Sequence, residues 1–166
     1  MSESLRHKDL NSLTEARKNR KVYRKKLLQL KKQKPKQLNR QFNELHDKEF
    51  QTMDCLTCAN CCRTTSPIFR NADINRIAKH LRVKAGSFTE KYLKLDEDND
   101  YVLQQSPCSF LNEDNTCQIY EVRPLACREY PHTDRKNVTQ IMDLTIRNTT
   151  VCPAVARIVK EILRNT

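Results

Sequence analysis

Hydrophobic residues in the first part of the chain recur at the spacing of an amphipathic helix. Tyr23, Leu27 and Leu30 stand at positions i, i+4 and i+7 of a stretch without Pro or Gly, from about residue 12 to 34. Leu, Lys, Arg and Gln dominate this stretch and favour helices, so the pattern predicts one helix with a narrow apolar stripe. Pro35 is expected to end it. A second helix is predicted after the proline, with an apolar face made of Leu38, Phe42 and Leu45.

Three further helices are predicted later in the chain. The apolar residues between Ile68 and Leu81 favour a short amphipathic helix with Asn71 as its N-cap. The segment RPLACREY suits one or two helical turns with Pro124 at the first position. The last helix is predicted to start near Pro153, and its apolar face consists of Val155, Ile158, Val159 and Ile162.

Strands and turns are predicted from shorter signals. Ser87 followed by Glu90 has the spacing of a capping box. In CSFLNEDNTCQIY, two apolar runs flank a polar turn, which predicts a β-hairpin over 108–120 with residues 112–115 at its tip. A short strand is expected over 141–146. The chain is therefore predicted to be mainly α-helical with a small β-hairpin.

Composition limits the class of protein. Of the 166 residues, 37% are hydrophobic and 31% are charged, so the core is small and the length suits one domain with an appendage. Gly86 is the single glycine, which excludes the glycine-rich loops that bind nucleotide phosphates. The sequence shows neither a membrane-spanning run nor an N-terminal signal sequence, so we expect a cytoplasmic protein without membrane association.

Charge and cysteine are segregated along the chain. Residues 1–50 carry a net charge of +9 out of the total of +11, and all eight cysteines follow them. We therefore expect a basic helical N-terminal arm over 1–49 and a small metal-stabilised domain over 50–166. Between Arg17 and Lys36 there are eleven basic residues and no acidic one. This run suits either a surface that binds nucleic acid or the ribosome, or a solvated helix face.

The cysteines have the spacing of metal ligands. The segment CLTCANCC contains two C-x2-C spacings in succession, and each allows two thiolates to converge on one metal from a tight turn. Adjacent side chains of an extended segment point to opposite sides, so Cys61 and Cys62 could divide between two centres. Eight thiols are enough for two tetrahedral sites or for a bridged cluster. The predicted metal ligands are Cys55, Cys58, Cys61, Cys62, Cys108, Cys117, Cys127 and Cys152.

The thiols could form disulfides, stay buried without a ligand, or bind metal, and metal binding explains best why so many lie close together in the sequence. A disulfide framework would need an oxidising compartment, and unligated buried thiols would need no such spacing. Zinc suits sites made only of thiolates and contributes folding energy directly. However, Cys55, Cys58 and Cys61 also reproduce the C-x2-C-x2-C run of bacterial ferredoxins. Zinc, iron and an iron–sulfur cluster therefore all stay open as cofactors.

The downstream cysteines lie among residues that could support a metal site. The predicted hairpin would bring Cys108 and Cys117 together, and the next cysteine follows on a helical turn. Arg123 and Arg128 could offset the charge of clustered thiolates, or pair with nearby acidic residues instead. His132 is either a further ligand or an orienting or surface residue.

These motifs together resemble the YkgJ-type cysteine-cluster family of zinc- or iron-chelating domains. The resemblance rests on C-x2-C-x2-C-C, P-C-x-F-L, C-x-I-Y-x-x-R-P and C-R-x-Y-P, and it covers about residues 50–155. Family members often have glycine where this chain has Ala59, which calls into question the left-handed turn that glycine allows, although Asn60 could adopt it. The resemblance implies as chelators Cys55, Cys58, Cys61, Cys62, Cys108, Cys117 and Cys127, with Cys152 as a further downstream cysteine.

Three functions are compatible with these features. The first is a non-catalytic protein that binds metal ions in one or two thiolate sites. The second is an iron–sulfur redox protein or oxidoreductase, and the third is a nucleic-acid-associated module in which metal supports the fold. The sequence shows no cofactor loop and no acid–base pair, so no catalytic residue is assigned and a non-catalytic role is favoured.

Overall fold

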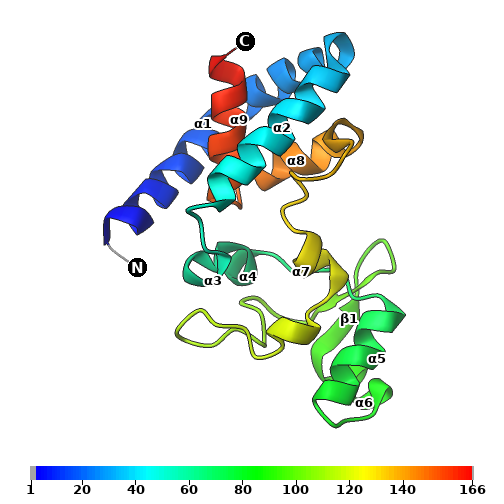
Figure 1. Cartoon of the computed structure of the whole chain (residues 1–166). Helices are drawn as coiled ribbons and strands as arrows, with labels where there is room; N and C mark the ends of the chain where they lie inside the picture. The colour runs from blue at the N-terminus through cyan, green and yellow to red at the C-terminus, as the bar shows by residue number, and fades with distance from the viewer. Residues whose placement is uncertain (1–2, 166) are drawn as a thin grey trace. The chain divides into compact units, whose positions relative to one another are not determined.

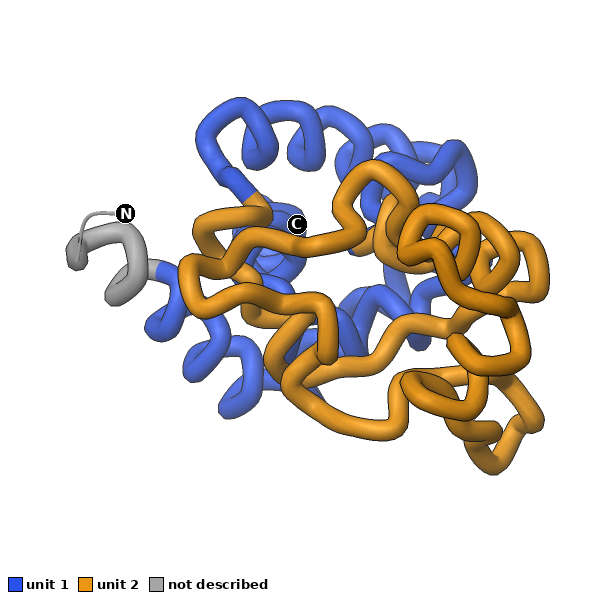
Figure 2. The backbone as a smooth tube through the Cα atoms, turned by 90° about the horizontal axis from the view of Figure 1, so that it is seen from below, with its two compact units in different colours: residues 1–54, 131–166 blue, residues 55–130 orange. Residues whose placement is uncertain are grey.

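The computed structural model describes residues 3–165, with side chains from Asp9 onward. It is mostly helical with one two-stranded antiparallel hairpin, as the sequence predicted (Figure 1). It divides into two compact units, which we describe separately: unit 1 contains residues 1–54 and 131–166, and unit 2 contains residues 55–130 (Figure 2). Residues 131–166, expected in one domain with the cysteine motif, are thus grouped with the N-terminal helices.

Unit 1 is an arrangement of helices. It contains α1 (Glu3–Gln33), α2 (Pro35–Phe50), the 3-10 helix η2 (Val138–Ile141), α8 (Met142–Asn148) and α9 (Pro153–Arg164). The predicted helices of the N-terminal region and the last helix are confirmed. Pro35 occupies the first turn of α2, where a missing N–H costs nothing, so the chain changes helix at this residue.

The core of unit 1 comes from the predicted apolar stripes. α1 packs against α9, α8 and α2, and α9 also packs against α2. Side chains from all of these helices are excluded from solvent, including Leu27, Leu38, Phe42, Met142, Val155 and Ile162. The stripe of α1 is therefore part of a shared helical core.

A half-buried arginine joins three helices of unit 1. Arg157 of α9 donates hydrogen bonds to Asp9 of α1 at 2.6 Å and to Glu49 of α2. Only 17% of the Arg157 side chain is exposed, so these charges are shielded from water and both carboxylates are needed to satisfy it. Burial opposes the charged form of Arg157, yet the carboxylates outweigh it and raise its pKa.

One predicted strand in unit 1 is wrong. Ile141 ends η2, and residues 142–146 belong to α8, so this segment does not form a strand. The β-branched residues of this segment suggested a strand, but Met142 and Ile146 are both buried and lie four residues apart, which is the spacing of one helix face. The Thr145 hydroxyl donates to the Ile141 carbonyl at 3.2 Å, which satisfies its polar group inside the helix.

Unit 2 consists of short elements. In chain order they are α3 (Cys55–Cys58), α4 (Asn60–Thr64), α5 (Asn71–His80), α6 (Ala85–Tyr92), β1 (Leu93–Leu95), β2 (Tyr101–Leu103), the 3-10 helix η1 (Tyr120–Val122) and α7 (Leu125–Glu129). Its core is a cluster of buried residues rich in aromatic rings. Phe88 lies 6.3 Å from Phe69 and 6.1 Å from Phe110 between ring centroids.

The hairpin of unit 2 was predicted in the wrong place. β1 and β2 pair with Leu93 opposite Leu103, whereas residues 108–120 contain a single antiparallel bridge, between Leu111 and Cys117. The β1–β2 turn is closed by Asp96, whose side chain accepts hydrogen bonds from two backbone N–H groups. Residues 108–120 form successive turns, so they contain no extended segment long enough for a second pair of hydrogen-bonded strands.

The predicted helix starts in unit 2 need small corrections. Arg70, not Asn71, caps α5, because its N–H donates to the Asp73 carboxylate at 3.1 Å. α6 already begins at Ala85, so Ser87 lies inside the helix and forms no capping box there. Pro124 is the residue before α7. Within residues 3–165, no helix is both long and apolar enough to cross a membrane.

Candidate metal centre

The motif CLTCANCC forms α3 and α4, with a sharp turn between them. Ala59 makes this turn in the left-handed region, with φ of 48° and ψ of 13°. The turn that was in question for lack of glycine is therefore present, and Ala59 adopts it rather than Asn60. A left-handed alanine costs roughly 1–2 kcal/mol, which other contacts of the motif must outweigh.

The loop that carries Cys108 and Cys117 is hydrogen-bonded to this motif. The Cys108 N–H donates to the Cys62 carbonyl at 2.8 Å. The Ser106 hydroxyl donates to the Arg63 carbonyl at 2.9 Å. These bonds join the chain on the N-terminal side of Cys108 directly to α4, so two cysteine-bearing segments far apart in the sequence lie side by side in unit 2.

Asn115 makes a second connection between the same segments. It lies at the tip of the turn between the two cysteines, with a positive φ of 72°. Its side-chain amide donates to the Thr57 carbonyl of α3 at 3.2 Å, and its side-chain oxygen accepts a hydrogen bond from Arg63 of α4. Asn115 thus connects both helices of the motif to the downstream loop, and we call these two bonds the Asn115 clamp.

The segment before Cys127 is held by α5. Asp73 is 2% exposed, and its carboxylate accepts hydrogen bonds from Arg76 at 2.6 Å and from the Leu125 N–H at 3.1 Å. Arg76 in turn donates to the carbonyls of Val122 and Arg123. The pair on α5 therefore sets where α7 begins, and α7 carries Cys127.

The hydrogen bonds also determine the charge of Asp73. Burial opposes its ionised form, but the bonds from Arg76 and from two backbone N–H groups outweigh burial and lower the pKa of the carboxyl. Asp73 is thus an anion inside unit 2, and its counter-ion is the neighbouring guanidinium.

Four thiols of unit 2 lie within electrostatic reach of one another. Burial raises the pKa of Cys127 to about 12, and the charges of three other thiols add to this effect. Burial also raises the pKa of Cys108 and Cys117, and the charge of Cys62 contributes to both shifts. Cys108 and Cys117 pack against the aromatic core. We call the four thiols whose charges influence one another the thiol cluster; they are Cys62, Cys108, Cys117 and Cys127.

Cys62 is the member of the thiol cluster that ionises most easily. A hydrogen bond from the adjacent Cys61 thiol lowers the pKa of Cys62 to about 7, against the effect of burial, and the two sulfur atoms are 3.9 Å apart. Once Cys62 is a thiolate, each further thiolate nearby is disfavoured by like charge. A cation among the thiols would remove that penalty.

The other predicted ligands have different positions. Cys55 and Cys58 lie on α3, and Cys61 precedes Cys62 on α4. Cys152 is buried directly before α9 in unit 1, and its N–H donates to the Asn148 carbonyl at 2.8 Å. His132 also lies in unit 1, with a left-handed φ of 66°. None of the eight cysteines, all of which the structure describes, forms a disulfide bond.

The donors fit a thiophilic metal in chemistry, although the side chains are not yet arranged as ligands. Soft thiolates are the donors that zinc and iron–sulfur clusters use. Across the described part of the chain, no three His, Cys, Asp or Glu side chains form a group that could already hold a metal ion. Metal binding would thus require the thiols to lose protons and to turn toward a common point.

Sequence reasoning found the cysteines but missed the residues that position them. Asp73, Arg76 and Asn115 join segments distant in sequence, and neither spacing nor composition signals such contacts. Arg63 was missed too, and its charge acts on Cys62. Of the two arginines considered for charge balance, Arg123 acts on Cys117 and Cys127 and also stacks on the Tyr120 ring at 3.8 Å.

Comparison with known proteins identifies the cysteine region. A model of the family described as "CxxCxxCC: Putative zinc- or iron-chelating domain" matches residues 54–153. Neither a search of the curated proteins nor a search of the solved structures found a match. The match covers more than half of the chain and includes every predicted cysteine ligand.

Proposed function

We propose that this chain, which belongs to the CxxCxxCC family of zinc- or iron-chelating domains, binds zinc or iron through the thiol cluster of unit 2. The observation that supports the proposal is the hydrogen bond that joins the Cys108 backbone to that of Cys62, together with the effect of the charges of Cys62, Cys108 and Cys117 on Cys127. Family membership supports metal binding in general, and the cluster supplies candidate ligands.

A site made of four thiolates suits a structural or storage role. Four protein ligands fill a tetrahedral ion completely and leave no position for water or substrate. The positive charges of Arg63 and Arg123 act on these thiols and would offset part of the negative charge that such a site carries. We therefore propose a non-catalytic role in a reducing compartment such as the cytoplasm, where free thiols persist.

The remaining motif cysteines support a second site or a cluster. Cys55, Cys58 and Cys61 have the spacing of ferredoxin ligands, which favours an iron–sulfur redox protein as the second candidate. Anaerobic purification followed by elemental analysis and an absorption spectrum separates the two functions. A colourless zinc protein supports the first candidate, whereas a brown protein whose visible band fades on reduction supports the second.

The proposed ligands are tested by exchanging one sulfur for oxygen. Cys127→Ser should lower the metal content by about one ion per chain, because a hydroxyl is a poor ligand for a thiophilic metal. Ala126→Ser is the matched control, since it places the same side chain on the neighbouring residue of α7. Full metal content in Cys127→Ser would overturn the assignment of the thiol cluster.

A further inference from the structure

We infer that the solvent-exposed basic face of α1 binds the sugar–phosphate backbone of a double-stranded nucleic acid. This surface, the α1 basic face, is defined by four lysines of one helix: Lys18, Lys21, Lys25 and Lys32. The inference concerns unit 1 alone and does not depend on metal binding.

The four lysines lie on one side of α1. Their spacings of three, four and seven residues place them along a single helix face, which extends about 21 Å at 1.5 Å per residue. All four are exposed. Tyr23 and Leu27 on the same helix are buried in the core of unit 1, so the lysines point away from the packed side of the helix.

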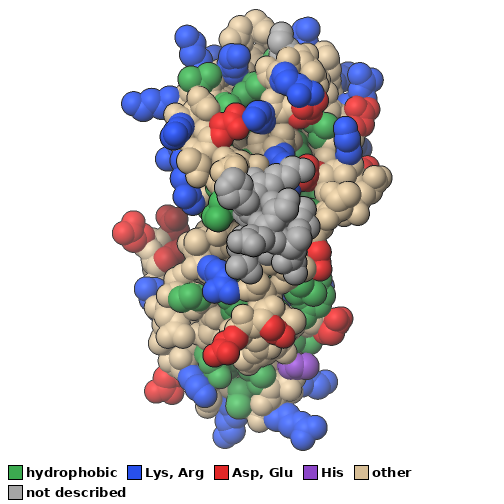
Figure 3. Space-filling model, turned by 90° about the vertical axis from the view of Figure 1, so that its left-hand side faces the viewer, with side chains coloured by type: hydrophobic (Ala, Val, Ile, Leu, Met, Phe, Trp, Pro, Cys, Tyr) green, Lys and Arg blue, Asp and Glu red, His purple; other side chains and the backbone are tan. Residues whose placement is uncertain are grey.

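The α1 basic face has no acidic residues to neutralise it. Arg24 pairs with Asp143 at 2.9 Å, and Arg17 donates to a backbone carbonyl of Thr150. For the four lysines, no ion pair is found among the residues that the structure describes. The sequence has no acidic residue between Glu15 and Glu44. In the space-filling view, many Lys and Arg side chains project from the upper half of the molecule, with some acidic side chains among them (Figure 3).

A row of lysines without neighbouring carboxylates is suited to bind a polyanion. Each lysine that meets a phosphate releases a counterion from the nucleic acid, and this release drives binding. α1 packs against α2, α8 and α9 on its apolar side, which leaves the lysine side facing solvent. Lysine ammonium groups contact phosphates as point charges and read no base pattern by themselves. The expected contacts are therefore with phosphates, without preference for sequence.

Two features of α1 favour a duplex over other polyanionic partners. A membrane-surface helix inserts its apolar side into lipid, but that side of α1 is buried, with Tyr23 at 7% and Leu27 at 0% exposure. A surface for single strands presents aromatic rings for base stacking, but Tyr23, which is the single Phe, Tyr or Trp in the sequence of α1, is buried.

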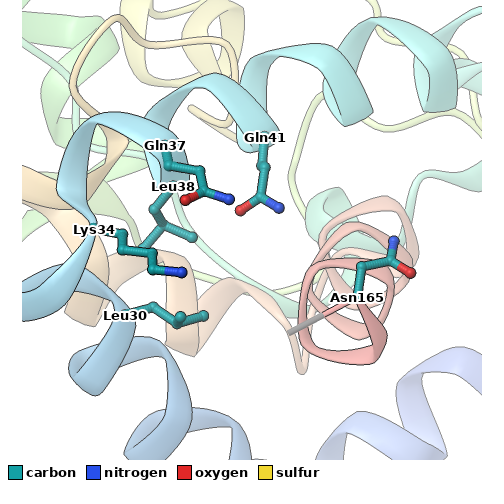
Figure 4. Close-up of a pocket in the computed structure, with 6 residues that line it drawn as sticks. All are labelled: Leu30, Lys34, Gln37, Leu38, Gln41 and Asn165. Atoms are coloured by element: carbon teal, nitrogen blue, oxygen red, sulfur yellow. The ribbon is translucent and has the colours of Figure 1, made fainter.

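A small hollow at the end of α1 is separate from the α1 basic face. It is lined by Lys34, between α1 and α2, and by Leu30, Gln37, Leu38, Gln41 and Asn165 (Figure 4). Leu30 and Leu38 are buried, so the hollow lies on the packed side of α1 and adds nothing to the α1 basic face.

The test compares two charge-matched variants of the full chain. The face variant carries Lys18→Gln, Lys21→Gln and Lys25→Gln, and glutamine preserves helix propensity. The control variant carries the same change at three exposed lysines of unit 2, Lys79, Lys84 and Lys94. Binding to a short RNA duplex, a DNA duplex, a single strand and anionic vesicles is measured against salt, with circular dichroism and metal content as checks of folding.

We expect the wild-type chain to bind both duplexes with an affinity that falls steeply with salt. The face variant should bind at least about tenfold more weakly, and the slope of log K against log salt should fall by about 3. The control variant should match the wild type. Equal loss in both variants, tighter binding to the single strand, or binding to vesicles alone would overturn the inference, whichever metal the protein holds.

Discussion

The two units of this chain are stabilised in different ways. Unit 1 has two long helices, an apolar core and a half-buried ion pair around Arg157. Unit 2 has α-helices of four to ten residues and strands of three, and its segments are joined by side-chain hydrogen bonds near the cysteines. Short elements are marginal without tertiary contacts or metal, so the proposed site is expected to stabilise unit 2 more than unit 1.

Removal of metal is expected to produce the largest difference in stability between the two units. A chelator under reducing conditions should abolish most amide protection in residues 55–130, because structural thiolate sites contribute folding energy. Protection in α1, α2 and α9 should remain, since their core needs no metal. Hydrogen exchange resolved by mass spectrometry measures both units in one sample. Equal loss of protection in both units would contradict the distinction.

A smaller effect is expected at the buried carboxylate of unit 2. Asp73→Asn should lower the free energy of unfolding by about 2–3 kcal/mol at pH 7, because it removes charged hydrogen bonds to Arg76 and to the Leu125 N–H. Thermal or urea unfolding measures it.

The same variant has a defined pH dependence. The pKa of Asp73 is lowered in the folded state, so the charged form stabilises unit 2 above the usual pKa of 3.8 and this stability is lost as the pH falls through the folded pKa. The difference between wild type and Asp73→Asn should stay constant from about pH 7 to 5 and shrink below about pH 4. A difference that grows in acid would be inconsistent with an ionised Asp73.

The smallest of these effects is expected at the Asn115 clamp. Asn115→Ala should weaken metal binding by about tenfold, because residues that orient ligands contribute to affinity without touching the metal. Competition with a chromogenic chelator measures it. Asn99→Ala is the control: Asn99 also has a positive φ, of 61°, but it lies in the β1–β2 turn away from the cysteine segments. Equal effects in both variants would mean that backbone strain, not the clamp, is responsible.

Prediction from the sequence succeeded better for the long helices of unit 1 than for the short elements of unit 2. α1, α2 and α9 were predicted because their apolar residues repeat over several turns, and Pro35 and Pro153 mark helix starts. The β1–β2 hairpin was missed because three-residue strands carry too little pattern. A short strand was expected over 141–146, but Met142 and Ile146 are buried at the spacing of one helix face and belong to α8.

At the candidate site, the sequence predicted the cysteines but not the residues that hold their segments together. The cysteines and the family followed from local spacing, which a sequence shows directly. The Asn115 clamp and the Asp73–Arg76 pair depend on segments that meet only after folding. The left-handed turn was questioned because alanine rarely adopts it, and tertiary contacts override that preference at Ala59.

The hydrogen bond between the Cys108 N–H and the Cys62 carbonyl closes a loop of about 45 residues, and closing a loop costs chain entropy. That loop contains α5, α6, β1 and β2, which carry most of the aromatic core, so their packing offsets the cost. We therefore expect the downstream thiols to join the motif late in folding. A chain emerging from the ribosome would first offer only the local cysteines of CLTCANCC. Full metal loading would then report that unit 2 has completed its core.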